Sequence, residues 1–355
     1  MSKLFEPITL RDVTVRNRLM VSPMCMYSSV DGFADDWHLV HLGSRAVGGA
    51  ALVIAEATAV SPEGRISPYD LGIWKDDHVD ALARTTSFIE AQGAVAGIQL
   101  AHAGRKASVD APWRGGRTLD ESEGGWRPVY APSAIAFSQR TPVPVAMTHN
   151  DITRIIADFR SAAVRALEAG FRVIELHGAH GYLLHEFLSP ISNVREDEYG
   201  GAFENRARFV LECVDAVREV WPERLPLFVR LSATDWTGGG WDIEQTVDLS
   251  RELTRHGVDV VDCSTGGNVH GAVIPVGPGY QVPFAARVRK DTGIITGAVG
   301  MISEPAQAEE IIATGRADFV IMARELLRDP YFPLRAARVL GEAIAWPPQY
   351  ERARV

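Results

Sequence analysis

The sequence has few cysteines and no long uninterrupted apolar run. Its three cysteines, Cys25, Cys213 and Cys263, are too far apart to form a CxxC redox motif or a metal-binding knuckle. The longest apolar stretch, residues 46–60, is interrupted by Glu56 and is too short to span a bilayer. The first residues contain no apolar signal region, so we expect a cytoplasmic protein that does not enter a membrane.

Clustered positive charge is also missing. The formal net charge is −9, and the arginines are scattered along the chain. This distribution argues against a surface for nucleic acid or for anionic membranes. A chain of 355 residues with 46% hydrophobic residues can bury a large core, as one large domain or two ordinary ones.

Short apolar, β-branched runs recur through the chain, and each ends in polar or glycine-containing residues. They predict eight strands, at residues 18–22, 51–58, 95–100, 172–177, 225–231, 258–264, 294–299 and 318–323. Helical patterns between them are clearest at residues 76–92, 151–169, 203–220, 243–256 and 305–314.

This alternation predicts an α/β fold, a TIM (β/α)8 barrel formed by residues 1–355 as a single domain. A doubly wound open sheet is the alternative. It would need a GxGxxG turn after an early strand, and none occurs there.

Two additions to the barrel are expected. Residues 4–16 are typical of a hairpin that closes the barrel floor before the first strand. Residues 103–148, rich in Gly, Pro and Trp, form a long insertion after the third strand, and we expect them to cap the catalytic face. The run Gly238 to Gly240 is interpreted as a tight turn rather than a phosphate cradle.

The most distinctive polar residues follow the fourth predicted strand. His177 and His180 lie three residues apart, and Tyr182 comes two residues later. Catalytic groups of a TIM barrel lie at the C-terminal ends of its strands. Two imidazoles and a phenol there suit a site that binds an oxygen atom and delivers a proton to the carbon beside it.

The other strand ends carry polar motifs as well. They comprise residues 22–27, 56–58, 99–106, 230–236, 297–301 and 322–325. With the His/Tyr block they closely resemble the old yellow enzyme family of FMN-dependent ene-reductases, which are TIM barrels. The resemblance extends over nearly the whole chain. At position 25 this sequence has cysteine, where other branches of the family have threonine. In this respect it resembles the branch that contains the xenobiotic reductases and the thermophilic-like members.

The resemblance implies a non-covalent FMN, reduced by NADPH or NADH. The residues implied to hold FMN are Ser22, Pro23, Met24, Cys25, Ala57, Gln99, Arg230, Gly300, Met301, Ala323 and Arg324. The last four would bind the phosphate through their main chain. Arg230 would lie at the N1/O2 edge of the ring and stabilise the charge of reduced flavin. Many relatives have Gly-Arg where this chain has Ala323-Arg324. The added methyl group of Ala323 would leave the phosphate less room to approach the main chain.

The resemblance also implies the reaction. The enzyme would reduce the activated C=C bond of α,β-unsaturated carbonyl compounds, with ping-pong hydride transfer through flavin N5. His177 and His180 would hydrogen-bond the carbonyl oxygen, and Tyr182 would protonate the α-carbon. Tyr27 would contact substrate from the opposite wall. Cys25 would tune the flavin rather than attack substrate.

The C-terminal residues 345–355 form the last segment of interest. Two prolines follow an apolar helix and predict an extended tail. The sequence Gln-Tyr-Glu-Arg at 349–352 resembles the tail with which thermophilic-like members reach the neighbouring active site. Arg352 would then contact substrate in a homodimer or a dimer-based tetramer. Arg354 lies close enough to be the alternative.

Three other classes of protein remain possible on the residues alone. A metal-dependent hydrolase could use the histidines of the block and Glu186, but their spacing matches no common metal motif. A Schiff-base aldolase needs a lysine at a strand end, and none of the four lysines is there. A non-catalytic barrel would not need His177, His180 and Tyr182 together with Arg230 and Gln99 at its strand ends. The physiological alkene and the preference for NADPH or NADH stay open.

Overall fold

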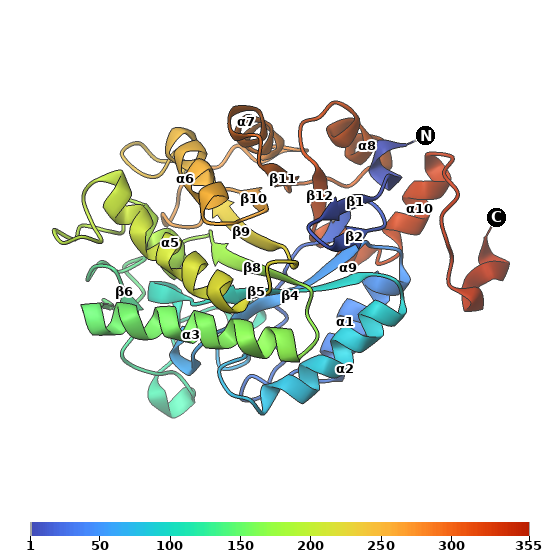
Figure 1. The fold of residues 1–355 in the computed structure, drawn as a ribbon. Helices are drawn as coiled ribbons and strands as arrows, with labels where there is room; N and C mark the ends of the chain where they lie inside the picture. The colour runs from blue at the N-terminus through green and yellow to red at the C-terminus, as the bar shows by residue number, and fades with distance from the viewer. Residues whose placement is uncertain (1, 355) are drawn as a thin grey trace.

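A computed structural model, which describes residues 2–354, shows parallel strands closed into a barrel (Figure 1). The strands follow one another around the barrel in chain order. They are β3 (Leu19–Val21), β4 (Leu52–Ala59), β5 (Val95–Ala101), β8 (Val173–Gly178), β9 (Leu227–Ser232), β10 (Val260–Ser264), β11 (Ile295–Ala298) and β12 (Phe319–Met322). Each predicted strand is present with its ends within two residues, so the TIM-barrel prediction is confirmed.

Helices form the outer layer around the strands (Figure 1). Five of them confirm the predicted helical patterns: α2 (His78–Ala91), α3 (His149–Glu168), α5 (Phe203–Val220), α6 (Ile243–Arg255) and α8 (Pro305–Ala313). The others are α1 (Asp36–Val47), α4 (Leu183–Leu188), α7 (Val282–Thr292), α9 (Arg324–Arg328) and α10 (Phe332–Val339).

The hairpin closes the N-terminal end of the barrel. Strands β1 (Ile8–Leu10) and β2 (Val13–Val15) pair antiparallel. Leu10 and Val15 are buried in one apolar cluster with side chains from the starts of the barrel strands, which include Leu52, Val173, Phe228, Val260 and Phe319. Burial of such side chains stabilises the fold by about 1.5–3 kcal/mol each. This end is therefore a packed floor, and the opposite end is left for chemistry.

The insertion after β5, residues 103–148, is called the cap below. It contains three short 3-10 helices, η3 (Gly104–Lys106), η4 (Pro112–Arg114) and η5 (Glu121–Glu123), and two short strands, β6 (Tyr130–Ala131) and β7 (Val145–Ala146). Cap residues such as Ala103 and Val129 share a small apolar cluster with Cys25, Tyr27 and Tyr182 at the barrel mouth. The cap therefore lies against the C-terminal ends of the strands, as predicted.

The C-terminal segment differs from the extended tail that the prolines predict. Pro348 opens a 3-10 helix, η6 (Pro348–Ala353). The fixed φ of proline suits the first turn of a helix, which explains why the prediction was wrong. Tyr350 of η6 packs on Tyr331, with ring centroids 5.9 Å apart. Figure 1 shows this segment standing away from the barrel beyond α10.

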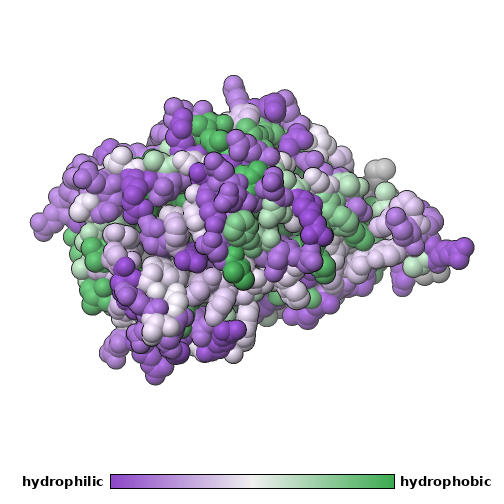
Figure 2. All heavy atoms as spheres, turned by 90° about the horizontal axis from the view of Figure 1, so that it is seen from below, coloured by the Kyte–Doolittle hydropathy of each residue, from purple (hydrophilic) through white to green (hydrophobic). Residues whose placement is uncertain are grey.

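The face of the molecule drawn in Figure 2 is mostly polar. Figure 2 shows a face on which hydrophilic side chains predominate and apolar ones form separate small patches. Within residues 2–354, no helix combines the length and the apolar composition that crossing a bilayer requires.

Candidate active site

Three rings lie together at the end of β8. His177 belongs to the strand, His180 follows in a left-handed backbone conformation (φ 60°), and Tyr182 directly precedes α4. The centroid of the His177 ring is 5.1 Å from that of His180 and 5.0 Å from that of Tyr182. The fold thus brings the three predicted catalytic residues into mutual contact at the barrel mouth.

Both imidazoles are uncharged at neutral pH. Burial, and after it the guanidinium of Arg230, lowers the pKa of His177 and of His180 well below the usual value. Nδ1 of His177 is buried and has no hydrogen-bond partner within residues 2–354. Because an unpaired buried polar atom is costly, we infer that this nitrogen serves a ligand.

The Ser264 hydroxyl is the hydrogen-bond neighbour of the His180 ring. Nε2 of His180 lies 2.7 Å from Oγ of Ser264, and either atom can be the donor. Ser264 Oγ also lies 3.3 Å from Oε1 of Gln281, which accepts a 2.7 Å hydrogen bond from Thr265. In the tautomer in which Ser264 donates to Nε2, the ring proton is on Nδ1, where it can be donated to a ligand.

Cys25 and Tyr27 form another wall of the mouth. Burial, followed by the charges of Glu56 and Asp70, raises the pKa of the Cys25 thiol well above its usual value. Burial, followed by the influence of Cys25 and Tyr27, does the same for the pKa of Tyr182. The Tyr182 phenol is therefore protonated at neutral pH and can act as a proton donor. The Cys25 thiol is also protonated, whereas a nucleophilic cysteine would be ionised.

The segment after β3 runs along the edge of the mouth. Ser22 is buried, whereas Pro23, Met24 and Cys25 are half-buried. The Ser22 N–H donates to the Met322 carbonyl at 2.9 Å, which ties this segment to β12. The main chain of Ala57 in β4 hydrogen-bonds the Cys25 sulfur. The predicted ring-edge residues therefore lie side by side.

Below the mouth, polar side chains of four neighbouring strands pair in the barrel interior. Gln99 of β5 donates to Oε1 of Glu175 at 2.7 Å. Nε of Arg230 lies 3.0 Å from Oδ2 of Asp262, and its Nη1 donates to Ser22 Oγ at 3.0 Å. The predicted Gln99 and Arg230 are thus both held by carboxyl groups that were not predicted as site residues.

Glu175 and Asp262 carry one excess negative charge relative to Arg230 when both are ionised. Burial, followed by the charge of Asp262, raises the pKa of Glu175, and burial also raises the pKa of Asp262. The pair therefore retains a proton near neutral pH. The sequence did contain a signal for Glu175 as a site residue. Glu175 is a carboxylate in a mostly apolar strand, and it lies two residues from His177, so both side chains point to the same face of β8.

A cavity of about 230 Å³ opens between the loops that follow β11 and β12. Its lining includes Gly300, Met301, Ala323 and Arg324, together with Gln281. Gly300 has φ 116°, and a Cβ there would lie 2.9 Å from Nε2 of Gln281. Only glycine lets the main chain take this path.

These features fit FMN. The cavity after the seventh and eighth barrel strands is where TIM barrels bind phosphate. The ring-edge segment begins beside this cavity, because Ser22 donates to Met322, which lines it, and Arg230 donates to Ser22 in turn. The unpaired Nδ1 of His177 faces a ligand in our interpretation. All the residues predicted to hold the cofactor are thus found on the same end of the barrel.

Arg352 is placed differently. It is exposed on η6, and within residues 2–354 no contact joins it to His177, His180 or Tyr182. Its predicted role therefore depends on a neighbouring subunit.

His185 holds the loop that carries His180 and Tyr182 in place. Nδ1 of His185 accepts from the Gly181 N–H at 2.9 Å, and Nε2 lies 3.1 Å from Oδ1 of Asp235. Glu186 accepts from the Arg105 N–H at 2.8 Å. His185 and Glu186, which a hydrolase would use as metal ligands, are therefore engaged in holding the chain.

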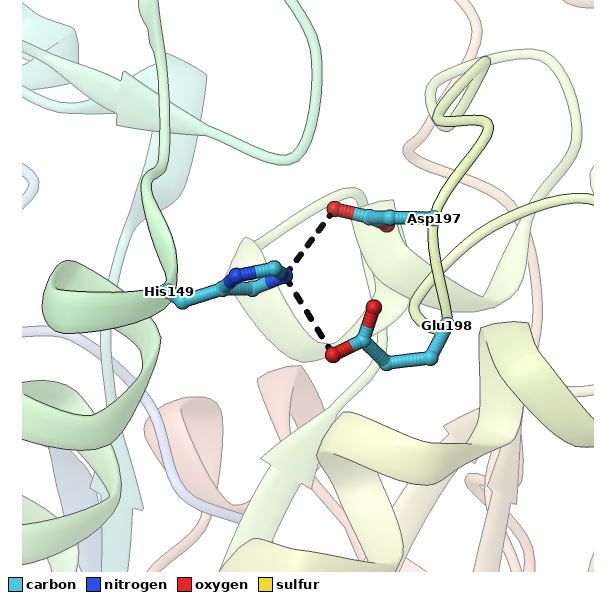
Figure 3. A group of neighbouring side chains, drawn as sticks. All are labelled: His149, Asp197 and Glu198. Atoms are coloured by element: carbon cyan, nitrogen blue, oxygen red, sulfur yellow. Dashed lines mark ion pairs between the residues drawn. The ribbon is translucent and has the colours of Figure 1, made fainter.

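One exposed trio does have the spacing of metal ligands. Nε2 of His149, at the start of α3, lies 3.3 Å from Asp197 and 3.4 Å from Glu198 (Figure 3). Arg195 already pairs with Asp197, with Nη2 at 2.5 Å and Nε at 2.9 Å from its two oxygens. We interpret the trio as a surface ion cluster that ties α3 to the loop before α5.

Known proteins resemble this chain over nearly its whole length. Residues 3–342 match the NADH:flavin oxidoreductase / NADH oxidase family. The chain is 52% identical over 353 residues to an NADPH dehydrogenase of Bacillus velezensis, covering 99% of both chains. It is 50% identical over 352 residues to an NADPH dehydrogenase of Bacillus subtilis, covering 99% of this chain and 98% of that one. Morphinone reductase superposes with a TM-score of 0.81 at 28% identity, covering 98% of this chain and 92% of its own.

We expect Gly300→Ala to weaken FMN binding. The methyl group would displace Gln281 and the main chain at the phosphate cavity. A weakened hydrogen bond to a charged group costs about 1.5–3 kcal/mol. The Kd for FMN, measured by fluorescence during flavin release and rebinding, should therefore rise about tenfold or more.

Gly293→Ala is the matched control. Gly293 also has a positive φ (77°) but has nothing within 4 Å of the added carbon. It should lose stability through backbone strain and keep the FMN affinity. Equal FMN affinity in both variants would contradict the phosphate assignment.

Proposed function

Because this chain belongs to the NADH:flavin oxidoreductase / NADH oxidase family, the old yellow enzymes, we propose that it reduces the activated C=C bond of α,β-unsaturated carbonyl compounds. It is an FMN-dependent oxidoreductase that uses NADH or NADPH. The observation that carries the proposal is the contact of two neutral imidazoles and a protonated phenol at the barrel mouth.

FMN supplies the hydride acceptor and donor when it is bound. Its phosphate would lie against the main chain of Gly300, Met301, Ala323 and Arg324. Its ring would be edged by residues 22–25 and Ala57, with Gln99 on the pyrimidine side and Arg230 near N1 and O2. The guanidinium of Arg230 favours negative charge at that edge.

The two imidazoles would bind the substrate oxygen. Nδ1 of His177 has no other partner among the described residues. In the proposed state Ser264 donates to Nε2 of His180, which leaves the ring proton of His180 on Nδ1. Neutral imidazoles donate hydrogen bonds without giving up a proton. As the substrate gains hydride at its β-carbon, charge builds on the oxygen, and these donors stabilise the enolate.

Tyr182 would deliver the proton to the α-carbon. Its ring centroid lies 5.0 Å from that of His177, so the phenol would lie beside a substrate whose oxygen is bound by His177. The raised pKa keeps the phenol protonated until the enolate forms. Tyr27, whose ring contacts that of Trp113 edge-on with centroids 5.7 Å apart, would form the opposite wall.

The reductant is proposed to be NADPH, and the two half-reactions to alternate in ping-pong order. The similar Bacillus proteins are named NADPH dehydrogenases, which supports the choice. Both NADPH and the alkene would use the space above the three rings, so one must leave before the other binds.

We expect Tyr182→Phe to slow the half-reaction with cyclohexenone and to leave the half-reaction with NADPH nearly unchanged. A positioned general acid contributes roughly 100-fold to 10,000-fold. Anaerobic stopped-flow absorbance of the flavin measures each half-reaction separately. Tyr199→Phe is the matched control, because Tyr199 donates to Glu212 outside the site. An equal loss in both half-reactions would show that Tyr182 is not the proton donor.

The protein is further proposed to be a homo-oligomer, a homodimer or a dimer-based tetramer, in which Arg352 reaches the neighbouring active site. Arg352 is exposed, and its short helix stands off the barrel while Tyr350 anchors it to Tyr331. A segment held in this way can present a guanidinium to another subunit.

Arg352→Gln should lower the rate with cyclohexenone and leave bound FMN unchanged, because the residue is remote from its own subunit's cofactor site. Arg354→Gln tests the alternative residue and should have the smaller effect, since Arg354 already pairs with Glu351 at 3.4 Å. Steady-state rates and flavin content would be compared. A fully active monomer, seen by ultracentrifugation at assay concentration, would contradict the shared site.

A further inference from the structure

A second cavity, called the cap cavity below, leads outward from the catalytic rings. It has a volume of about 340 Å³ and lies between the cap and the loop after β10. Its lining residues include Tyr182 and Lys106, and also Arg117, Arg140 and His270. Arg117 and Arg140 are exposed, whereas Lys106 is half-buried. The cavity therefore connects the proposed proton donor with the outer surface of the cap.

The charge of the cap cavity is opposite to that of the whole chain. Three cationic side chains line it, and among the described residues no aspartate or glutamate does. The chain as a whole has a formal net charge of −9. The cavity is thus a local positive site on an acidic protein, which favours an anionic ligand.

The three cations differ in how their charge is matched. Arg117 forms two contacts with Glu123, at 2.8 Å and 2.5 Å, so its charge is largely neutralised. Arg140 forms no ion pair within residues 2–354, and its main chain belongs to a turn fixed by hydrogen bonds between Ser138 and Thr141. The guanidinium of Arg140 is therefore available to bind an anion, and its main chain is held in place by the turn.

Lys106 provides the inner positive charge. Its Nζ donates to the carbonyls of His180 at 2.9 Å and Gly267 at 3.1 Å, which are neutral acceptors. The same Nζ lies 5.0 Å from the ring centroid of Tyr182 and 4.7 Å from that of Phe137. Burial lowers the pKa of Lys106 to about 8, so the ammonium remains mostly charged at neutral pH.

We propose that the cap cavity binds the phosphate groups of the reduced nicotinamide dinucleotide, with Arg140 as the main contact and Lys106 as the inner positive charge. This inference rests on the proposed function, in which the nicotinamide lies beside His177 and Tyr182. The rest of the dinucleotide is long and anionic and has to leave the barrel mouth. The cap cavity leads away from Tyr182, and it carries the charge that a phosphate requires.

The test measures binding without turnover. Tetrahydro-NADPH, which cannot donate hydride, is titrated into the FMN-loaded protein and followed by calorimetry. Arg140→Gln should raise its Kd about tenfold, and the dependence of Kd on salt should become shallower. Arg172→Gln is the matched control, because Arg172 is exposed at the start of β8, on the floor side of the barrel.

Two further ligands distinguish the sources of the anion. If tetrahydro-NADH is weakened as much as tetrahydro-NADPH, the contact is with the diphosphate. If only tetrahydro-NADPH is weakened, the contact is with the 2′-phosphate. Either result supports the proposal. Unchanged Kd values for both dinucleotides would overturn it, and so would an effect confined to turnover of an enone that bears a carboxylate.

The same variant separates this inference from the proposed function. The half-reaction with neutral cyclohexenone should be unaffected by Arg140→Gln, because that substrate offers no anion. If wild-type protein bound tetrahydro-NADPH through Arg140 but reduced no enone, alkene reduction would be wrong and the phosphate site would stand.

Discussion

The ion pair between Arg230 and Asp262 is the interaction on which the active site depends most. Both side chains are buried in the barrel, 3.0 Å apart. Removing one partner of such a pair costs about 3–5 kcal/mol, because the remaining charge has no water. Arg230 also donates to Ser22, where the ring-edge segment begins, and after burial it contributes most to the lowered pKa of His177 and His180. The guanidinium of Arg230 thus has two effects: it holds the start of the ring-edge segment, and it favours the neutral form of both imidazoles.

Backbone strain gathers at the same end of the barrel. Tyr27, His180 and Met301 all have positive φ values without being glycine, at 50°, 60° and 50°. Such conformations cost about 1–3 kcal/mol each and persist when surrounding structure enforces them. Around His180 that structure is Ser264 on the ring, Ser232 on the backbone N–H and Lys106 on the carbonyl. On the floor side, Arg11 in the turn between β1 and β2 also has a positive φ, 51°, so this strain is concentrated at the mouth without being confined to it.

The sequence predicts the barrel well because each strand carries its own local signal. Five helices lie outside the predicted patterns, and the two longest of them, α1 and α7, contain residues that usually disfavour helix. α1 includes Gly43 and is started by a capping box at Asp35, and α7 has Pro283 in its first turn, where proline is tolerated. The contact among the three rings of the proposed site could be predicted because His177, His180 and Tyr182 are close in sequence. Glu175 and Asp262 could not be paired with Gln99 and Arg230 in this way, because those contacts join different strands. The positive cap cavity likewise depends on how residues 106, 117 and 140 fold together.

The central claim is that His177 and His180 act as neutral donors to an oxygen that becomes negative. It is tested most directly by titrating the FMN-loaded protein with 4-hydroxybenzaldehyde over a range of pH, with ionisation of the phenol followed by absorbance. Two hydrogen bonds to the phenolate, each worth about 1.5 kcal/mol or more, should lower the pKa of the bound phenol by about two units. Replacing either histidine by alanine should reverse about half of that shift. A phenol that binds with an unshifted pKa would contradict the claim.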